Sequence, residues 1–456
     1  MANRNTHPPF SFFIYSPDTS QDHILLDRFS PAWLRINQTG LDIAESIDRG
    51  ESLDAIARRI SDRYEIPFQT AKNDGASVYK ALAQKQMLPP VGSKDRRPVR
   101  IPRLDSLYLH ITNRCNLSCL QCYAGAGQRK KDLDLPTARI LALIDELVDQ
   151  GGNSITISGG EPFLHPDIEQ ILAYAGRKLS IRLLSNGTRI DEKRAQWLAD
   201  LDVFIQLSID GPNSEINDAI RGKGTFKRIL RAIDLLHAAG LSERLNLCTT
   251  VMNQNISHLH EIIRLADRLG VPLVRFLPLR DCGAAHGNWG DIASGITVQD
   301  HEAFYHEIQK LMTRVEKPAI SVSCGLSGFM LEVPEPFDDG IWCPVGRQLV
   351  VNTDGHVYPC VLLMQEAYGI GNIFHDDLDA MIQSSEMAGM CEMLVSRRHQ
   401  IEKCASCQWQ NLCQAGCMGQ ALDNRGTIWD VDDFCTYRYA AYGKAFQKLL
   451  KPAKTG

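Results

Sequence analysis

The sequence has no run of about 20 apolar residues, the length that an α-helix needs to cross a bilayer, so we expect no membrane-spanning helix. The N-terminal residues MANRNTHPPFSFFIYS do not join a charged segment to a long apolar one, which argues against a secretory signal peptide. Basic charge is not in excess either, because 49 Lys and Arg stand against 54 Asp and Glu. A net charge of −5 gives no attraction to nucleic acid or to a membrane surface, and we expect a cytoplasmic protein.

Cysteine is absent before residue 115 and then becomes frequent, with 14 in the chain. Without a secretory signal, this number favours metal binding in a reducing compartment over disulfides. Cys115, Cys119 and Cys122 lie in CNLSCLQC, directly after the apolar segment LYLHIT, which predicts a strand. A 4Fe–4S cluster normally takes four thiolates, so three at this spacing leave one iron open to a substrate. Structural zinc is the alternative, but it prefers a closed set of four ligands.

Polar motifs follow the next predicted strands in a fixed order: ISGGEPFLHPD, SNGT, QLSIDGP and IRGKGTF. Each alone is weak, since GGEP could be a turn, SNGT a hairpin and Arg221 a solvated charge. In this order behind the cysteines, however, they give a chain that resembles the radical S-adenosylmethionine (radical SAM) enzymes. The resemblance implies a 4Fe–4S cluster on the three cysteines and S-adenosylmethionine bound by Gly159, Gly160, Glu161, Pro162, Ser185, Asn186, Ser208, Asp210 and Arg221. In that family the glycines let the backbone approach the cofactor, Glu161 would accept from its ammonium group, and Arg221 would bind a carboxylate.

Segments with helical periodicity alternate with short apolar segments from residue 104 to residue 318. In TARILALIDELVDQGG, for example, the apolar residues fall on one helical stripe. Repeated strand–helix units predict an α/β fold with a parallel sheet and right-handed crossovers. Six such strands suit a partial (β/α)6 radical SAM barrel, with the motifs at the carboxyl ends of the strands.

Nine cysteines lie between residues 324 and 435, and their spacing resembles the SPASM extension of radical SAM peptide-modifying enzymes. We assign residues 319–440 to this extension and 441–456 to a C-terminal tail. The resemblance implies an outer auxiliary 4Fe–4S cluster on Cys404, Cys407, Cys413 and Cys435. It implies an inner one on Cys343, Cys360 and Cys417, with Cys324 as the nearest candidate for a fourth ligand. A zinc ribbon is the alternative, because C-x2-C pairs also bind zinc. Cys248, Cys282 and Cys391 are unassigned, and small buried hydrophobes are the default for such residues.

The first 90 residues contain no cysteine and predict a winged-helix-like module. FSFFIYS, HILLDRF and AWLRIN are strand candidates, and amphipathic helices follow, one with Ser52 as its N-cap. The module resembles the PqqD-like recognition element of maturases that act on ribosomally made peptides. That resemblance implies a leader peptide added as a strand to an exposed sheet edge, so proline in LLDRF should weaken binding if that strand is the edge. DNA binding is the generic alternative, but residues 48–63 form no basic face. A Pro- and Arg-rich linker spans residues 91–103.

Taken together, the resemblances imply a radical SAM maturase of a ribosomally synthesised precursor peptide. Reductive cleavage of S-adenosylmethionine would yield a radical that abstracts a hydrogen atom, and oxidative closure would form a thioether or C–C crosslink. The implied partners are the precursor peptide and a reductant such as flavodoxin or ferredoxin. Two alternatives stay open: a formylglycine-forming oxidase of the sulfatase-maturating type, and a non-catalytic iron–sulfur electron-transfer protein. Val361 counts against the first, because that family has an aspartate after the corresponding cysteine.

Overall fold

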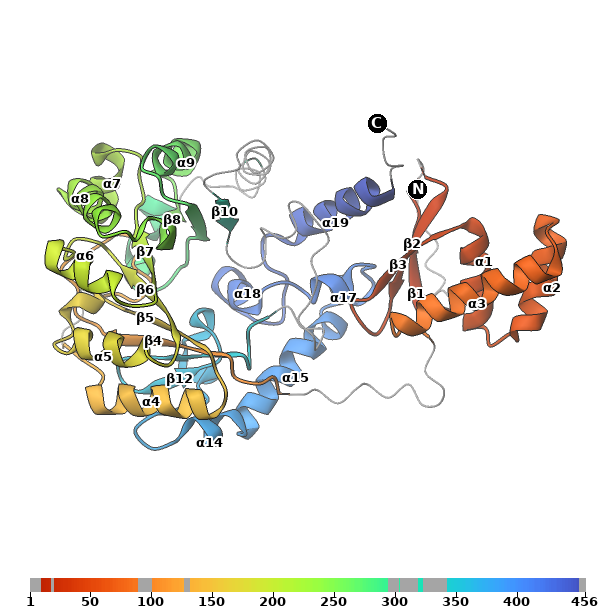
Figure 1. Cartoon of the computed structure of the whole chain (residues 1–456), viewed down its shortest axis with the longest axis horizontal. Coiled ribbons are helices and arrows are strands. Elements are labelled where there is room, and N and C mark those ends of the chain that lie inside the picture. The colour runs from red at the N-terminus through yellow and green to blue at the C-terminus, as the bar shows by residue number, and fades with distance from the viewer. Residues whose placement is uncertain are drawn as a thin grey trace.

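The structure is a computed structural model, and it describes residues 10–17, 20–88, 101–126, 132–293, 303, 319–322 and 343–450. An N-terminal module, a large α/β part and a cysteine-rich C-terminal part follow one another along the chain (Figure 1). Across the described ranges, no helix has both the length and the apolar character needed to cross a membrane. Cys324 and most of the expected linker lie outside the described residues.

The N-terminal module has the predicted three strands followed by three helices. They are β1 (Phe12–Tyr15), β2 (Asp22–Asp27), β3 (Trp33–Asn37), α1 (Gln38–Asp48), α2 (Leu53–Tyr64) and α3 (Phe68–Gln84). The helices enclose a core of their own with one face of the sheet, which includes Ile43, Ile56 and Leu82. Ser52 caps α2 as predicted, because its side chain accepts a hydrogen bond from the backbone N–H of Ala55.

The LLDRF strand does not lie at the sheet edge, so the condition attached to the proline substitution in that strand is not met. The strands pair antiparallel in the order β1-β2-β3, so β2 is the central strand. Leu25 is paired with Ile14 of β1 on one side and with Leu34 of β3 on the other. Within the described residues, the edges of this sheet are therefore β1 and β3.

The large α/β part contains the six expected parallel strands, β4 to β9, which are neighbours in chain order. Its strands are β4 (Ser106–Thr112), β5 (Ser154–Gly159), β6 (Ser180–Ser185), β7 (Val203–Ser208), β8 (Leu245–Val251), β9 (Leu273–Pro278) and β10 (Ala319–Val322). Its helices are α4 (Thr137–Asp149), α5 (Ile168–Ala175), α6 (Glu192–Ala199), α7 (Ser214–Arg221), α8 (Thr225–Ala238), α9 (Leu259–Arg268), α10 (Ala284–Gly287) and α11 (Trp289–Ile292). The sheet therefore carries the carboxyl ends of its strands, and the motifs that follow them, along one rim.

The C-terminal part contributes further strands to the same sheet. β11 (Gln348–Val351) pairs parallel with β4, and β12 (His356–Tyr358) and β13 (Gly371–Asn372) extend the sheet antiparallel. Helices α14 (Leu378–Ile382), α15 (Ser385–Gln400), α16 (Glu402–Ala405), α17 (Gln410–Cys413), α18 (Met418–Arg425) and α19 (Cys435–Leu450) follow. The expected boundary at residue 440 thus falls inside α19.

The N-terminal sheet packs its second face against the C-terminal part, where β2 and β3 lie beside α17 and α19 (Figure 1). The ring of Tyr15 lies 5.1 Å from that of Trp409, and the ring of Trp33 lies 5.3 Å from that of Phe446. Asn411 also donates a hydrogen bond to the carbonyl oxygen of Asp27. Since Trp409 and Asn411 lie between Cys407 and Cys413, the module contacts the segment that carries the late cysteines.

Candidate functional site

Cys115, Cys119 and Cys122 lie on the loop that leaves the carboxyl end of β4. Two helices of the α/β part, α7 and α10, hold this loop in place. The N–H of Leu120 donates to the carbonyl oxygen of Ile220 in α7, and the N–H of Ala284 in α10 donates to that of Cys122. The three thiols therefore have a position fixed by the fold.

The three cysteines lie within electrostatic reach of one another. Burial raises the pKa of Cys115 to about 11, and nearby Glu161, Cys119 and Cys122 add to the rise. Burial also raises the pKa of Cys119, while Arg221 opposes that rise. Cluster ligands must be thiolates, and buried thiols form them only when a positive charge compensates. The three residues fit a cationic iron–sulfur core, which supplies that charge.

The two glycines of the GGEP motif pack against the cysteine loop. A Cβ on Gly159 would lie 2.2 Å from the carbonyl oxygen of Thr112, and one on Gly160 would lie 2.2 Å from that of Arg114. The N–H groups of Gly160 and Glu161 donate to the same two carbonyl oxygens. In this structure the glycines thus let β5 approach the loop closely. The approach of their backbone to the cofactor, which the family resemblance implies, stays a prediction.

Glu161 is fully buried at the point where β5 and β6 end together. Its carboxylate accepts hydrogen bonds from the Ser185 hydroxyl and from the Asn186 N–H, both at 2.8 Å, and from the Phe163 N–H at 3.3 Å. Burial raises the pKa of Glu161, although these hydrogen bonds oppose the rise. A carboxylate has about four lone-pair positions, so Glu161 keeps acceptor capacity for one more donor group. Pro162 starts a short 3-10 helix directly after it.

Asp210 and Arg221 form a buried ion pair, in which the guanidinium NH1 lies 2.5 Å from the carboxylate. Asp210 also accepts hydrogen bonds from Gln121 of the cysteine loop and from the N–H of Thr250. The carboxylate that Arg221 contacts here is therefore that of Asp210. Ser208 is half-buried at the end of β7, two residues before Asp210.

The sequence did not point to a hydrogen-bonded group that lies inside the barrel beside the loop. The Tyr108 hydroxyl is 3.2 Å from that of Tyr123 and donates to the Ser158 hydroxyl. The Tyr123 hydroxyl is in turn 3.1 Å from Nε2 of His110. Alternation along β4 places Tyr108 and His110 on one face, and this was the signal available in LYLHIT.

The late cysteines fall into two groups. Burial raises the pKa of Cys343 above its usual range, and the nearby Cys360 and Cys417 add to this rise. Burial also raises the pKa of Cys360 to about 12. Burial raises the pKa of Cys404 to about 12, with contributions from Cys413, Cys435 and Cys407. The structure thus brings together the members of the expected inner set and, separately, those of the outer set. Their role as ligands stays a prediction.

The thirteen cysteines that the structure describes are free thiols. Cys248 and Cys391 are buried, whereas Cys282 is half-buried within electrostatic reach of Cys122. No three His, Cys, Asp or Glu side chains in the described ranges converge closely enough to hold a single metal ion. The side chains in each cysteine group are farther apart than the ligands of a single metal ion. This spacing suits a cubane, because there each thiolate binds a different iron.

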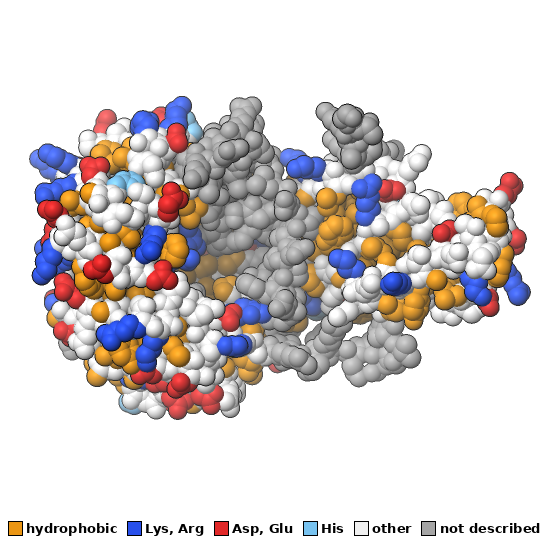
Figure 2. Space-filling view, in the orientation of Figure 1, with side chains coloured by type: hydrophobic (Ala, Val, Ile, Leu, Met, Phe, Trp, Pro, Cys, Tyr) orange, Lys and Arg blue, Asp and Glu red, His pale blue; other side chains and the backbone are white. Residues whose placement is uncertain are grey.

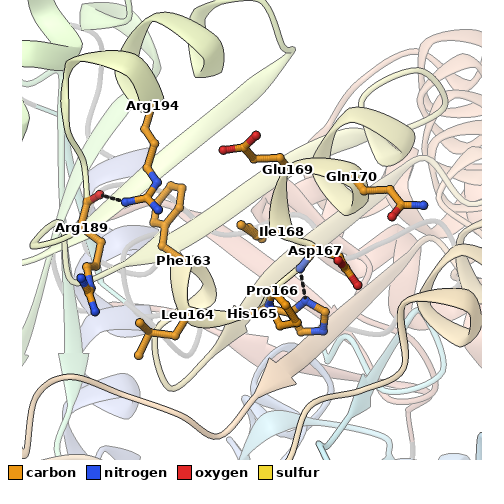
Figure 3. Close-up of a pocket in the computed structure, with 10 residues that line it drawn as sticks. All are labelled: Phe163, Leu164, His165, Pro166, Asp167, Ile168, Glu169, Gln170, Arg189 and Arg194. Carbon is orange, nitrogen blue, oxygen red and sulfur yellow. Dashed lines mark hydrogen bonds between the residues drawn. The ribbon is translucent and has the colours of Figure 1, made fainter.

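A surface hollow of about 570 Å³ lies beside the loops that lead into α5 and α6 (Figure 3). Figure 3 shows Arg194 donating to the carbonyl oxygen of Arg189 and the N–H of Asp167 donating to Nδ1 of His165. The two arginines face two acids, Asp167 and Glu169, so the hollow has no net charge. It contains none of the predicted site residues.

Comparison with known families matches each part of the chain. Residues 109–266 match the radical SAM superfamily, and residues 343–408 match SPASM, an iron–sulfur cluster-binding domain. Residues 22–88 match coenzyme PQQ synthesis protein D, PqqD. The matches cover the cysteine loop with its motifs, the late cysteines from Cys343 to Cys407, and the N-terminal module from β2 onward. Cys413, Cys417 and Cys435 lie beyond the end of the SPASM match.

Two relatives and two solved structures are similar over most of their own length. Mycofactocin maturase MftC of Mycolicibacterium smegmatis is 30% identical over 375 residues, which cover 76% of this chain and 86% of that protein. AdoMet-dependent heme synthase of Nitratidesulfovibrio vulgaris is 26% identical over 348 residues, 72% of this chain and 91% of that protein. Streptococcus suis SuiB bound to precursor peptide SuiA superposes with a TM-score of 0.60 at 14% identity, covering 92% of this chain and 97% of SuiB. The structure of anSMEcpe with bound AdoMet gives a TM-score of 0.60 at 18% identity, covering 76% and 98%. At these identities the two structures show a shared fold.

Proposed function

Because the chain belongs to the radical SAM enzymes that carry a SPASM domain and a PqqD-like domain, we propose that it modifies a ribosomally synthesised precursor peptide. The modification is hydrogen-atom abstraction followed by oxidative crosslinking, which forms a thioether or a C–C bond. One observation carries the proposal: a three-cysteine loop beside a buried glutamate occurs in one chain with a PqqD-like module packed on the cysteine-rich part. S-adenosylmethionine and iron–sulfur clusters are the cofactors of this enzyme family.

In this proposal, Cys115, Cys119 and Cys122 hold the cluster to which S-adenosylmethionine binds. The cluster and S-adenosylmethionine together supply one-electron radical chemistry. Glu161 orients the cofactor, because its carboxylate is fixed by Ser185 and Asn186 and retains acceptor capacity. The Asp210–Arg221 pair, tied to the loop by Gln121, keeps the loop and the end of β7 in register.

The peptide is proposed to bind at two places. The N-terminal module would hold the leader at an edge of its sheet, β1 or β3, where backbone hydrogen bonds supply affinity. The core of the peptide would reach the carboxyl ends of the barrel strands. Formylglycine formation is less well supported, because Val361 follows Cys360 and its carbonyl oxygen accepts a hydrogen bond from Arg280. A valine offers no acid or base at that position.

The outer cluster is assigned to Cys404, Cys407, Cys413 and Cys435, and the inner cluster to Cys343, Cys360 and Cys417, with Cys324 as candidate fourth ligand. Net oxidation of the peptide releases a second electron, and these clusters are placed to accept it. A flavodoxin or ferredoxin would supply the first electron. The free thiols and the oxygen-labile clusters favour a cytoplasmic location. We take the domains as residues 1–90, 104–318 and 319–440, with the linker 91–103 and the tail 441–456, of which residues 441–450 continue α19.

The test uses anaerobically reconstituted full-length protein and its variant with Cys115, Cys119 and Cys122 replaced by alanine. The parent should bind about twelve irons in three cubes, and the variant about eight. The variant should form no 5′-deoxyadenosine when reduced with S-adenosylmethionine, and retained cleavage would contradict the radical assignment. Co-expression with short open reading frames beside the gene should then give one peptide that loses the mass of two hydrogens. A larger loss would replace crosslinking by cleavage or decarboxylation.

A further inference from the structure

Arg397, in the last turn of α15, is a fully buried cation that forms its hydrogen bonds with backbone carbonyl groups. Its guanidinium donates to the carbonyl oxygens of Ile428 and Asp430, and also to those of Ala415 and Gly416. A buried charge is costly unless an opposite charge compensates it. The guanidinium lies within electrostatic reach of Asp432 and of Cys417, Cys404 and Cys343, so its charge acts on members of both groups of late cysteines.

The segment that Arg397 contacts joins the two cysteine groups. Cys413 belongs to the outer group and Cys417 to the inner group. The three residues between them, Gln414, Ala415 and Gly416, all have left-handed backbone conformations, with φ of 53°, 62° and 70°. Residues with a Cβ rarely adopt this conformation, and it persists only where the surroundings enforce it. Arg397 supplies part of that enforcement through the carbonyl oxygens of Ala415 and Gly416.

A second buried arginine, Arg438, contacts the same segment. Nε of Arg438 in α19 lies 3.4 Å from Sγ of Cys413, and its NH1 donates to Asp432 at 2.9 Å. Asp432 in turn accepts a hydrogen bond from the N–H of Cys417 at 2.8 Å. A Cβ on Gly416 would lie 2.0 Å from the Arg438 guanidinium, so the packing is tight. Both Arg438 and Asp432 are buried.

Two guanidinium groups and one carboxylate leave a net positive charge beside the Cys413–Cys417 segment. A 4Fe–4S cluster with its thiolates is negative and becomes more so on reduction. A fixed cation in a dry interior therefore stabilises the reduced form more than the oxidised form. We propose that Arg438 and Arg397 are positioning residues that raise the reduction potentials of the auxiliary clusters, Arg438 that of the outer one and Arg397 those of both. This inference rests on the ligand sets proposed above.

The test is an EPR-monitored redox titration of full-length protein in which Cys115, Cys119 and Cys122 are alanine, so that only auxiliary clusters contribute. Arg438→Gln should shift one of the two potentials to more negative values, and Arg397→Gln should shift both. Arg438→Lys and Arg397→Lys should restore most of each shift, because they keep the charge. Asp432→Asn removes a negative charge from the same place and should shift the potential in the opposite direction, which loosened packing alone would not do.

Arg139→Gln is the matched control, because Arg139 donates to the carbonyl oxygen of Ile373, pairs with Glu146, and has no cysteine among these contacts. It should leave both potentials unchanged. If the Gln variants do not bind iron, the Lys variants and Asp432→Asn decide the matter, and an unshifted Asp432→Asn potential overturns the proposal. A parent protein without two auxiliary clusters would overturn the ligand sets as well. If the parent holds two auxiliary clusters but none of these charge substitutions changes a reduction potential, this inference alone is overturned.

Discussion

Gly160 is the residue whose replacement should most directly displace the cysteine loop. Its added Cβ would stand 2.2 Å from the carbonyl oxygen of Arg114, a backbone atom that can move only with the loop. We expect Gly160→Ala to push Cys115 out of position, so that reconstituted protein loses about four of its irons, one cube. Iron analysis and 5′-deoxyadenosine formation measure this, and both should fall together.

Gly389→Ala is the matched control for this substitution. Gly389 lies in α15, and a Cβ there would meet no atom within 4 Å. Alanine is the better helix former by about 1 kcal/mol, so this variant should bind all its iron and unfold at the same or a higher temperature. Gly160→Ala protein with a full complement of iron would show that the loop tolerates the displacement.

Arg221 illustrates what the sequence could and could not predict at this scale. The motifs identified the residue types that carry chemistry, since the three cysteines, Glu161 and Arg221 all lie at the rim of the barrel. The sequence did not show which charges meet, because Arg221 was expected to bind a carboxylate without that carboxylate being identified. In the structure it pairs with Asp210. Partners of this kind depend on which strand ends are neighbours, and a linear motif does not contain that information.

The strands β4 to β9 could be predicted because each has its own local pattern of apolar residues, and β5 to β9 each follow a helical segment. The pairing of β11 with β4 could not, because it joins Gln348 to Ser106 across the whole barrel sequence. The order within the N-terminal sheet is a similar case. Three short strands were visible, but the pattern HILLDRF does not state that β2 has a partner on each side. Strand order is a property of contacts between segments.

A proline scan should locate the edge of the N-terminal sheet that binds the leader peptide. Along an edge strand, successive N–H groups point alternately toward the sheet and away from it. In the full-length protein, we expect proline at alternate positions of the leader-binding edge to leave the fold intact and to weaken leader binding. At the positions between, proline should remove a hydrogen bond of the sheet and lower the unfolding temperature. Fluorescence anisotropy of a labelled leader and thermal unfolding separate the two effects.

Proline at Ile24, Leu25 or Leu26 of β2 serves as the comparison, because these residues are paired with both β1 and β3, so proline there should destabilise the module. Scanning both β1 and β3 identifies the leader-binding edge. Only at that edge should a proline variant remain folded and still lose affinity for the leader. Leader affinity that is unaffected by folded variants of both edges would exclude recognition by strand addition.

The sheet of the N-terminal module is a layer between the helices of that module and the C-terminal part. Ile56 and Leu82 belong to the core on one face of its sheet, whereas Ile24 and Leu26 belong to the main core of the molecule. The sequence predicted a separable domain, because the linker and the absence of cysteines set it apart. It did not predict the docking, since Tyr15 and Trp409 are almost 400 residues apart. Figure 2 shows hydrophobic side chains gathered on the surface in this region.

This docking predicts that Phe446 stabilises both the N-terminal module and the segment between Cys407 and Cys413, although it is far from the barrel in sequence. Phe446 is fully buried, and its ring stacks on Trp409 at 5.4 Å and meets Trp33 edge-on. Truncating a buried phenylalanine costs about 3–5 kcal/mol. We expect Phe446→Ala to loosen the module, to expose the segment between Cys407 and Cys413, and to lower the iron content by up to about one cube.

Cofactor cleavage should survive in Phe446→Ala, because the cysteine loop and its motifs belong to the barrel, whereas Phe446 lies in α19. Phe29→Ala is the control, since Phe29 belongs to the same module but is 55% exposed. It should change neither unfolding temperature nor iron content. Iron analysis, thermal unfolding and 5′-deoxyadenosine formation on the two variants therefore test whether the module supports the outer cysteine group. If Phe446→Ala behaved like Phe29→Ala in all three measurements, the packed aromatic rings would contribute nothing to that group. The module would then act on the peptide alone.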